Sequence, residues 1–306
     1  MKKFIPRIIR VPGRLAKSIL AKDQNRALVA RWARDGAVAA NWGDKLNPYL
    51  IEQISGKRVL HQSEVFVDMV PAVHCVIGSL LGQINLSNAV VWGAGFLSSG
   101  DLMPVVPKAI HAVRGHLSNR RLLEQGLLKE EVPVGDPALL MPLLYRPNAT
   151  VVHDIGVIPH FRDHDLPIVR SLNESESFKV IDVCSGVGEF CDQITSCRQI
   201  ISSSLHGLIA AHSYGIPAKW VRLSERPKGD GFKFRDYLSS ISAQTAVPAE
   251  ARSVSDIEGV ARENSTIPSL PSIGALLDCC PFISPEELAR LKGKIALAYG
   301  ERTGRA

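Results

Sequence analysis

The amino-acid sequence predicts an α/β protein built from two halves. Short buried apolar runs alternate with helical patterns, and most of the runs end in glycine or polar residues, as in parallel βαβ units. A proline-containing stretch at residues 142–150 interrupts the alternation, and a second alternation follows it. We therefore divide the chain into a basic N-terminal arm (residues 1–26), a first α/β domain (27–145) and a second α/β domain (146–306).

The first half contains four apolar runs that predict buried strands. They lie at residues 28–32, 73–77, 89–92 and 110–113, and a helical pattern at 116–124 follows the last run. A further helix is expected from Tyr49 to Ser55, with Asn47 as its cap, Pro48 as its first residue and Gly56 after its end.

The loop before this helix carries Asn41, Gly43 and Asp44, between the end of one strand and the start of the helix. Open α/β sheets bind ligands at such places. A tight turn would also explain the glycine, but it would not require the polar neighbours. We therefore favour a binding site here.

The second half repeats the alternation around a strand–turn–helix–strand unit at residues 200–221. Strands are also expected at 154–159 and 178–183, and helices at 188–196, 205–214, 231–238, 254–264, 273–280 and 285–298. His206 lies in the first turn of the helix that follows Ser202, Ser203 and Ser204. Free backbone N–H groups and the helix dipole favour an anion there, and a histidine can donate a hydrogen bond or a proton to it. A histidine that only caps its own helix is the competing interpretation.

Composition limits the classes of partner. The formal net charge is +6 and the pI about 9.0, which suits anionic substrates or an anionic membrane surface, whereas no basic stripe with interleaved aromatics indicates nucleic acid binding. The six cysteines match no common zinc spacing, and a reducing cytoplasm is the simplest compartment for them. The basic N-terminus lacks the apolar core of a signal peptide. It fits a solvated arm or short helix, which we favour, or a segment lying on the membrane surface.

Four motifs stand in order along the chain: Asn41-Trp-Gly-Asp-Lys-Leu-Asn-Pro48, Ala112-Val-Arg-Gly115, Val134-Gly-Asp-Pro-Ala138 and Ser204-Leu-His-Gly-Leu208. Together they resemble the polysaccharide pyruvyl transferase family, most closely its exopolysaccharide members of the succinoglycan type, over roughly residues 28–240. The resemblance implies two Rossmann-like domains facing a cleft, as in GT-B glycosyltransferases, with C-terminal helices packing back on the first domain. It also implies transfer of the pyruvyl group of phosphoenolpyruvate onto a sugar of a lipid-linked precursor, forming a cyclic ketal.

This chemistry needs an acid, a base and several cations. We assign His206 as the acid or a phosphate ligand, and Asp44 as the base. Many family members carry arginine directly before Leu-His-Gly, where this chain has Ser204. Another cation must then hold phosphoenolpyruvate, and the candidates are Arg114, Arg222, Lys233 and Arg235. Further candidate substrate-binding residues are Asn41, Gly43, Asp136, His160 and Ser204.

We expect no metal and no cofactor, with phosphoenolpyruvate as co-substrate. The resemblance implies a cytoplasmic protein, associated peripherally with the inner face of the cell membrane, and other exopolysaccharide assembly enzymes as partners. One alternative is a nucleotide-sugar glycosyltransferase, which shares the architecture. The other is a non-catalytic subunit of an exopolysaccharide assembly complex, which Ser204 in place of arginine favours.

Overall fold

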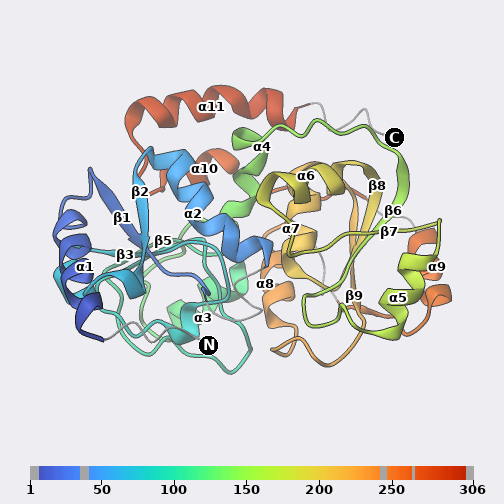
Figure 1. The fold of residues 1–306 in the computed structure, drawn as a ribbon, viewed down its shortest axis with the longest axis horizontal. Coiled ribbons are helices and arrows are strands. Elements are labelled where there is room, and N and C mark those ends of the chain that lie inside the picture. Colours follow the sequence, from blue (N-terminus) through green and yellow to red (C-terminus); the bar gives the residue numbers. More distant parts are fainter. Residues whose placement is uncertain (1–6, 35–40, 242–246, 264–265, 301–306) are drawn as a thin grey trace.

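The chain folds into two α/β lobes that lie side by side (Figure 1). The computed structural model describes residues 7–34, 41–241, 247–263 and 266–300. Each lobe is built on a five-stranded sheet in which all the paired strands are parallel. This confirms the predicted α/β class and is consistent with two Rossmann-like domains.

The first sheet has the strand order β2-β1-β3-β4-β5. Its strands are β1 (Ala27–Ala30), β2 (Arg58–His61), β3 (Val73–Cys75), β4 (Ala89–Trp92) and β5 (Ala109–Ala112). The second sheet has the order β10-β9-β8-β6-β7. Its strands are β6 (His153–Ile158), β7 (Lys179–Val180), β8 (Cys197–Ser202), β9 (Ala218–Arg222) and β10 (Ala249–Glu250). Because the sheets are parallel, each gathers the carboxyl ends of its strands at one edge.

Helices cover both sheets and fill the space between the lobes (Figure 1). The described helices are α1 (Arg7–Leu20), α2 (Trp42–Ser55), α3 (His116–Glu124), α4 (Met141–Leu144), α5 (Pro167–Glu174), α6 (Val187–Thr195), α7 (Leu205–Ser213), α8 (Phe232–Ser239), α9 (Val254–Arg262), α10 (Ile273–Asp278) and α11 (Pro285–Tyr299). None of these described helices is long and apolar enough to cross a bilayer.

The prediction for the start of α2 is wrong. The helix begins at Trp42, seven residues before the expected start, and Asn41 is its cap, with a side-chain oxygen that accepts from the Asp44 N–H at 3.3 Å. Asn47 instead lies inside the helix, where its side chain accepts from the Ile77 N–H at 3.0 Å and donates to the Ile77 carbonyl at 3.1 Å. Asn47 therefore ties α2 to the chain after β3, and Pro48 lies within the helix.

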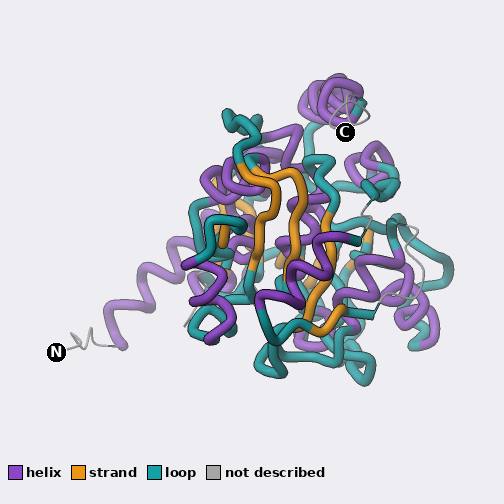
Figure 2. Tube along the Cα trace, turned by 90° about the vertical axis from the view of Figure 1, so that its right-hand side faces the viewer, coloured by secondary structure: helices purple, strands orange, loops and turns teal. Residues whose placement is uncertain are grey.

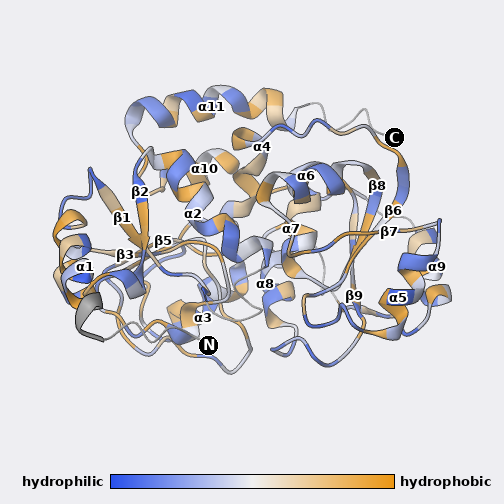
Figure 3. Ribbon diagram, viewed as in Figure 1, coloured by the Kyte–Doolittle hydropathy of each residue, from blue (hydrophilic) through white to orange (hydrophobic). Residues whose placement is uncertain are grey.

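The N-terminal segment forms a helix of 14 residues, α1, which stands away from the body of the molecule (Figure 2). Hydrophobic and hydrophilic residues alternate around it (Figure 3). Arg14 donates to the Val65 carbonyl at 2.6 Å, and the Ser18 hydroxyl accepts from the Phe66 N–H at 2.8 Å. One face of α1 is thus fastened to the first lobe.

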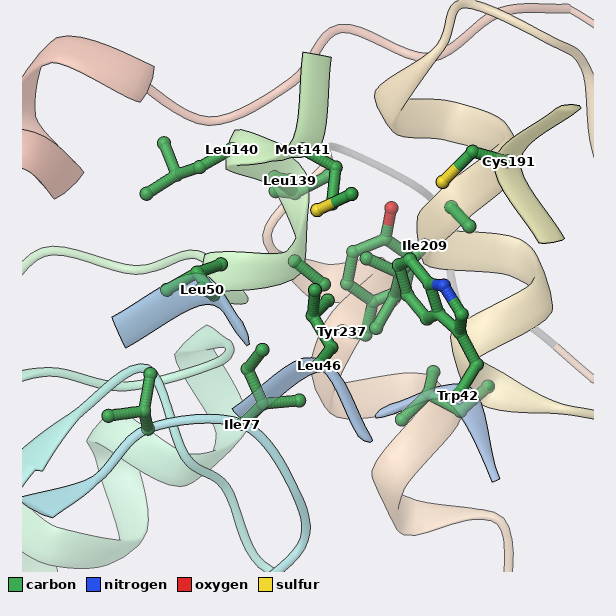
Figure 4. Close-up of a cluster of buried hydrophobic side chains, with 14 of the residues drawn as sticks. Trp42, Leu46, Leu50, Ile77, Leu139, Leu140, Met141, Cys191, Ile209 and Tyr237 are labelled. Atoms are coloured by element: carbon green, nitrogen blue, oxygen red, sulfur yellow. The ribbon is translucent and has the colours of Figure 1, made fainter. Parts of the chain in front are cut away.

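A continuous hydrophobic core joins the two lobes. Trp42 and Leu46 of α2 pack with Ile209 of α7, Tyr237 of α8 and Met141 of α4 (Figure 4). The Trp42 indole N–H also donates to the Val187 carbonyl at 3.1 Å. Burial of apolar surface is the main favourable term in folding, so this shared core favours one fixed arrangement of the lobes.

The C-terminal helices lie against the first lobe and the segment between the lobes. The Trp92 indole of β4 donates to the Leu276 carbonyl of α10 at 3.0 Å. In α11, Lys294 donates to the Leu143 carbonyl at 3.4 Å, and the Tyr299 hydroxyl donates to the Leu139 carbonyl at 2.5 Å. Ser284 caps α11, and its side-chain oxygen accepts from the Glu287 N–H at 3.2 Å.

Candidate active site

A cavity of about 320 Å³ is lined by residues of both lobes. The first lobe contributes residues at the start of α2 and after β3, and the second lobe contributes residues after β6, at the start of α7 and on α8. The polar lining residues that the following argument uses are Asn41, Asp44, Ser79, His160, Arg162, Ser204, His206, Lys228 and Lys233. The carboxyl ends of β6 and β8 thus open on this cavity, where an α/β sheet is expected to bind ligands.

His206 lies in the first turn of α7 and packs directly on the first turn of α2. A Cβ atom at Gly43 would come within 2.0 Å of the imidazole Cε1, so only glycine leaves room for this ring. The His206 Nε2 is buried and has no hydrogen-bond partner among the described residues. Burial, with help from the positive charges of Lys233 and Arg114, lowers the pKa of His206 to about 3. The free protein therefore presents a neutral imidazole.

Asp44 faces the same cavity from α2. Its carboxylate accepts from the Ala33 N–H at 2.9 Å and from the Asn41 side-chain amide. Burial nevertheless dominates and raises the pKa of Asp44 from 3.8 to about 6. A carboxylate with a pKa near the working pH is a better proton acceptor than an ordinary aspartate, so Asp44 suits a general base.

Three basic side chains line the cavity: Arg162, Lys228 and Lys233. Within the described parts of the chain, no aspartate or glutamate forms an ion pair with any of them. Burial, followed by repulsion from Arg114 and Arg162, lowers the pKa of Lys233 to about 8. An anion bound here would relieve this repulsion and raise the pKa of the lysine again.

His160 and Ser204 complete the lining. The backbone N–H of His160 donates to the Ser203 hydroxyl at 2.8 Å, and its Nδ1 accepts from the Arg162 N–H at 3.2 Å. This second bond leaves the ring proton on Nε2. Burial is the largest of the effects that lower the pKa of His160 to about 3. Ser204 occupies the cap position of α7 without a capping hydrogen bond from its side chain, so its hydroxyl remains free to contact a ligand.

Arg114 does not line this cavity. Its side chain is fully buried and forms an ion pair with Asp236 of α8, at 2.9 Å from Nη2. It also donates to the Phe96 carbonyl at 2.6 Å and to the Ser79 hydroxyl at 2.8 Å. Arg114 therefore joins the lobes and touches the cavity only through Ser79.

Asp136 also lies outside the cavity. It is fully buried at the start of the short 3₁₀ helix Pro137–Leu140, where one carboxylate oxygen accepts from the Ala138 N–H at 3.0 Å. The other oxygen has no partner among the described residues, and burial raises the pKa of Asp136 to about 6. The structure gives this residue a capping role.

Arg222 and Arg235 line a second cavity of about 460 Å³ in the second lobe. Lys228 and Lys233 line both cavities, so the two adjoin. In the second cavity Arg222 pairs with Glu250 at 2.5 Å, and Arg235 donates to the Asp230 carbonyl at 3.0 Å. The ring of Trp220 lies parallel to that of Phe234, with centroids 4.4 Å apart.

Comparison with known proteins agrees with this geometry. A family model described as polysaccharide pyruvyl transferase matches residues 84–224, from just before β4 to just after β9. A protein of Acanthamoeba polyphaga mimivirus, named "Uncharacterized protein L143", is 31% identical over 209 residues, which is 65% of this chain and 70% of that relative. The chain belongs to the polysaccharide pyruvyl transferase family. The family indicates an enzyme that transfers pyruvyl groups onto polysaccharide.

Within this pyruvyl transferase, six of the candidate residues from sequence line the first cavity: Asn41, Asp44, His160, Ser204, His206 and Lys233. Gly43 does not line the cavity but lies directly against the His206 ring. Sequence analysis did not select Arg162, Lys228 or Ser79. Arg162 and Ser79 each follow a strand end closely, which is the signal that could have identified them. Lys228 precedes the glycine pair Gly229 and Gly231 and has no comparable signal.

Across the described residues, no group of three or more histidine, cysteine, aspartate or glutamate side chains is placed to hold a metal ion.

Proposed function

We propose that this protein transfers the pyruvyl group of phosphoenolpyruvate onto two hydroxyls of a sugar, forming a cyclic ketal and releasing phosphate. The observation that carries the proposal is the charge of the first cavity. Lys233 and Arg162 line this cavity together with His206, whose Nε2 is buried and has no partner among the described residues, and no described carboxylate forms an ion pair with either cation. Such a cavity favours a small ligand with more than one negative charge.

Phosphoenolpyruvate fits this requirement because it carries both a carboxylate and a phosphate. We assign Lys233 and Arg162 as its cationic ligands, in the role that the arginine before Leu-His-Gly has in related sequences. The planar guanidinium of Arg162 suits a bidentate contact, and the Lys233 ammonium acts as a point charge. Binding of the anion would raise the low pKa of His206 and allow it to hold a proton.

The proposed reaction begins with protonation of C3 by His206, which gives an oxocarbenium-like centre at C2. One sugar hydroxyl oxygen attacks C2, and its proton passes to Asp44. The C2–O bond to phosphate then breaks, and the second hydroxyl attacks C2 to close the ketal ring. The two sugar hydroxyls release two protons in total. One of them replaces the proton that His206 gave to C3, and the other leaves on phosphate. The enzyme thus returns to its starting state.

The second cavity suits the neighbouring sugars of the acceptor. Its two arginines are compensated by Glu250 and Asp230, so the part of the cavity that they line can take a neutral ligand with many hydroxyls. The stacked Trp220 and Phe234 supply an aromatic surface on which the apolar face of a sugar ring can pack. Lys233 and Lys228 would then lie between the donor and the acceptor.

We further propose that the acceptor is a lipid-linked exopolysaccharide precursor of the succinoglycan type. We also propose that the lobes have a GT-B-like arrangement, and that the reaction takes place on the cytoplasmic face of the membrane, beside other assembly enzymes. Phosphoenolpyruvate is made in the cytoplasm, which supports that location.

The test is incubation of the full chain with phosphoenolpyruvate and lipid-linked oligosaccharide. We expect mass spectrometry to detect an added pyruvyl ketal, with release of one phosphate for each ketal. Binding of a nucleotide sugar but not of phosphoenolpyruvate would instead support a glycosyltransferase. Binding of neither donor, with retained binding to exopolysaccharide assembly proteins, would support a non-catalytic subunit.

A further inference from the structure

Helix α1 presents an apolar face to solvent. Val11, Leu15 and Ile19 are 53%, 42% and 57% exposed. They are spaced four residues apart, so they lie on one side of the helix. Because large apolar side chains in a contiguous exposed row are unusual in a monomeric protein, this face needs a partner.

The orientation of α1 is set by its polar face. Arg14 donates to the Val65 carbonyl, and its guanidinium lies 4.6 Å from the centre of the Phe66 ring. Lys17 forms an ion pair with Glu64, and Ser18 is fully buried against Phe66. These contacts hold the side chains of Arg14, Lys17 and Ser18 against the first lobe. The apolar row lies on another side of the helix and faces solvent.

The charge around α1 selects the kind of partner. Residues 1–22 contain no aspartate or glutamate. The basic residues of this segment are Lys2, Lys3, Arg7, Arg10, Arg14, Lys17 and Lys22. A segment that combines this exposed apolar row with a net positive charge in its sequence matches an anionic lipid surface, where the apolar side chains enter the boundary between headgroups and acyl chains.

We infer that α1 docks this protein on an anionic membrane surface through Val11, Leu15 and Ile19. The N-terminal end of the helix projects from the first lobe (Figure 2), and the exposed row of Val11, Leu15 and Ile19 lies on the side that the lobe leaves uncovered. The inference depends on α1 alone and holds whichever substrate the cavities bind.

The test is co-sedimentation of the full chain with vesicles of phosphatidylcholine alone or mixed with phosphatidylglycerol. Wild-type protein is expected to bind the anionic vesicles, to bind neutral vesicles weakly, and to be released by salt. The variant Val11→Ser/Leu15→Ser/Ile19→Ser should bind anionic vesicles roughly ten- to a hundredfold more weakly. Since the three side chains are exposed, its melting temperature should stay close to that of the wild type.

The matched control is Leu102→Ser/Val106→Ser, which removes two side chains of the first lobe that are 64% and 70% exposed. It should bind vesicles like the wild type. Equal binding by the triple variant and the wild type would overturn the inference. A second result would also overturn it: the wild type binds no vesicles, and light scattering shows a dimer for the wild type but a monomer for the triple variant. The apolar face would then join two copies of the chain.

Discussion

Lys233 is the cation best placed to hold an anionic donor, because it lines the cavity of His206, its charge acts on that histidine, and no described carboxylate forms an ion pair with it. A hydrogen bond to a charged group contributes about 1.5–3 kcal/mol. We therefore expect Lys233→Ala to weaken phosphoenolpyruvate binding by roughly 10- to 150-fold, as measured by calorimetry.

Arg235 provides a matched control on the same helix. It lines only the second cavity, and it donates to the Asp230 carbonyl. Arg235→Ala should leave the affinity for phosphoenolpyruvate unchanged and raise the KM for the saccharide. If Arg235→Ala instead weakened the binding of phosphoenolpyruvate and Lys233→Ala left it unchanged, the second cavity would hold the donor and the first would hold the acceptor.

His206 makes the stability of the protein depend on pH. Its pKa is about 3 in the folded chain and near 6.5 in the unfolded chain, so between these values only the unfolded state takes up the proton. Stability is therefore lost as the pH falls below 6.5. Compared with His206→Gln, the wild type should lose about 2 kcal/mol of unfolding free energy between pH 7 and pH 5.

Urea unfolding of the wild type and of His206→Gln, each at pH 7 and pH 5, measures this difference in unfolding free energy. The contributions of the other titrating groups are nearly the same in both proteins and largely cancel. Parallel changes in both proteins would show that His206 is protonated in the folded state. The same variant should lose roughly 10²- to 10⁴-fold in turnover if His206 is the acid.

Local sequence indicated the site residues that lie at strand ends and helix starts. His206, Asp44 and His160 could be selected from sequence because each stands at such a junction. Arg114 stands at one as well, but its partner Asp236 is 122 residues away in the chain. A pairing at that separation leaves no pattern in the local sequence, so the burial of Arg114 could not be predicted.

At the scale of elements, the site depends on the contact between the first turns of α2 and α7. Gly43 permits this contact, because a Cβ atom there would lie 2.0 Å from the His206 ring. Gly43→Ala should therefore displace the imidazole and lower turnover by at least about tenfold. The loss of turnover should approach that caused by removing a general acid–base group. Circular dichroism should show that the helices remain.

The control is Gly259→Ala in α9, where, apart from the neighbouring residues and the backbone of the same helix, no described atom lies within 4 Å of the added methyl group. Alanine is favoured over glycine in a helix by about 1 kcal/mol, so this control should be slightly stabilised and fully active. Full activity of Gly43→Ala would show that the imidazole can move without cost and that its placement over α2 is not required.

The positions of most elements followed from periodicity, but β2, β10 and α5 were not predicted, and the starts of elements followed less closely. Strand β4 and helix α3 have the predicted limits. Helix α2 starts earlier because Asn41, rather than Asn47, caps it. Both asparagines precede a suitable helical segment. The choice between them depends on Ile77, whose backbone binds Asn47 from the loop after β3, and such a tertiary contact is not visible in a local pattern.

At the scale of the whole molecule, the two lobes are joined by an apolar core and by one fully buried ion pair. Arg114 follows β5 of the first lobe, and Asp236 lies on α8 of the second. Asp236 also accepts from the backbone N–H and the hydroxyl of Ser118, both at 2.7 Å. The approach is so close that a Cβ atom at Gly115 would lie 1.7 Å from the Asp236 carbonyl oxygen.

Removing one member of a buried pair leaves the other charge without compensation, which typically costs about 3–5 kcal/mol. Arg114→Met and Asp236→Asn should each lower the melting temperature clearly. Replacing both residues, as in Arg114→Met/Asp236→Leu, should recover much of the loss, because two apolar side chains need no compensation. A double-mutant cycle from urea unfolding then gives the coupling between the lobes.

The same variants separate the structural role of Arg114 from the donor-binding role that sequence predicted. If Arg114 only joins the lobes, Arg114→Met and Asp236→Asn should change phosphoenolpyruvate affinity by similar, small factors per folded molecule, through the shared effect on Ser79. If Arg114 binds the donor itself, Arg114→Met should abolish binding while Asp236→Asn preserves it. The affinity for phosphoenolpyruvate, measured well below the melting temperature of each variant, decides between these two roles. We expect the structural role, because the guanidinium is buried against Asp236 and Phe96 and can reach a ligand only if these contacts open.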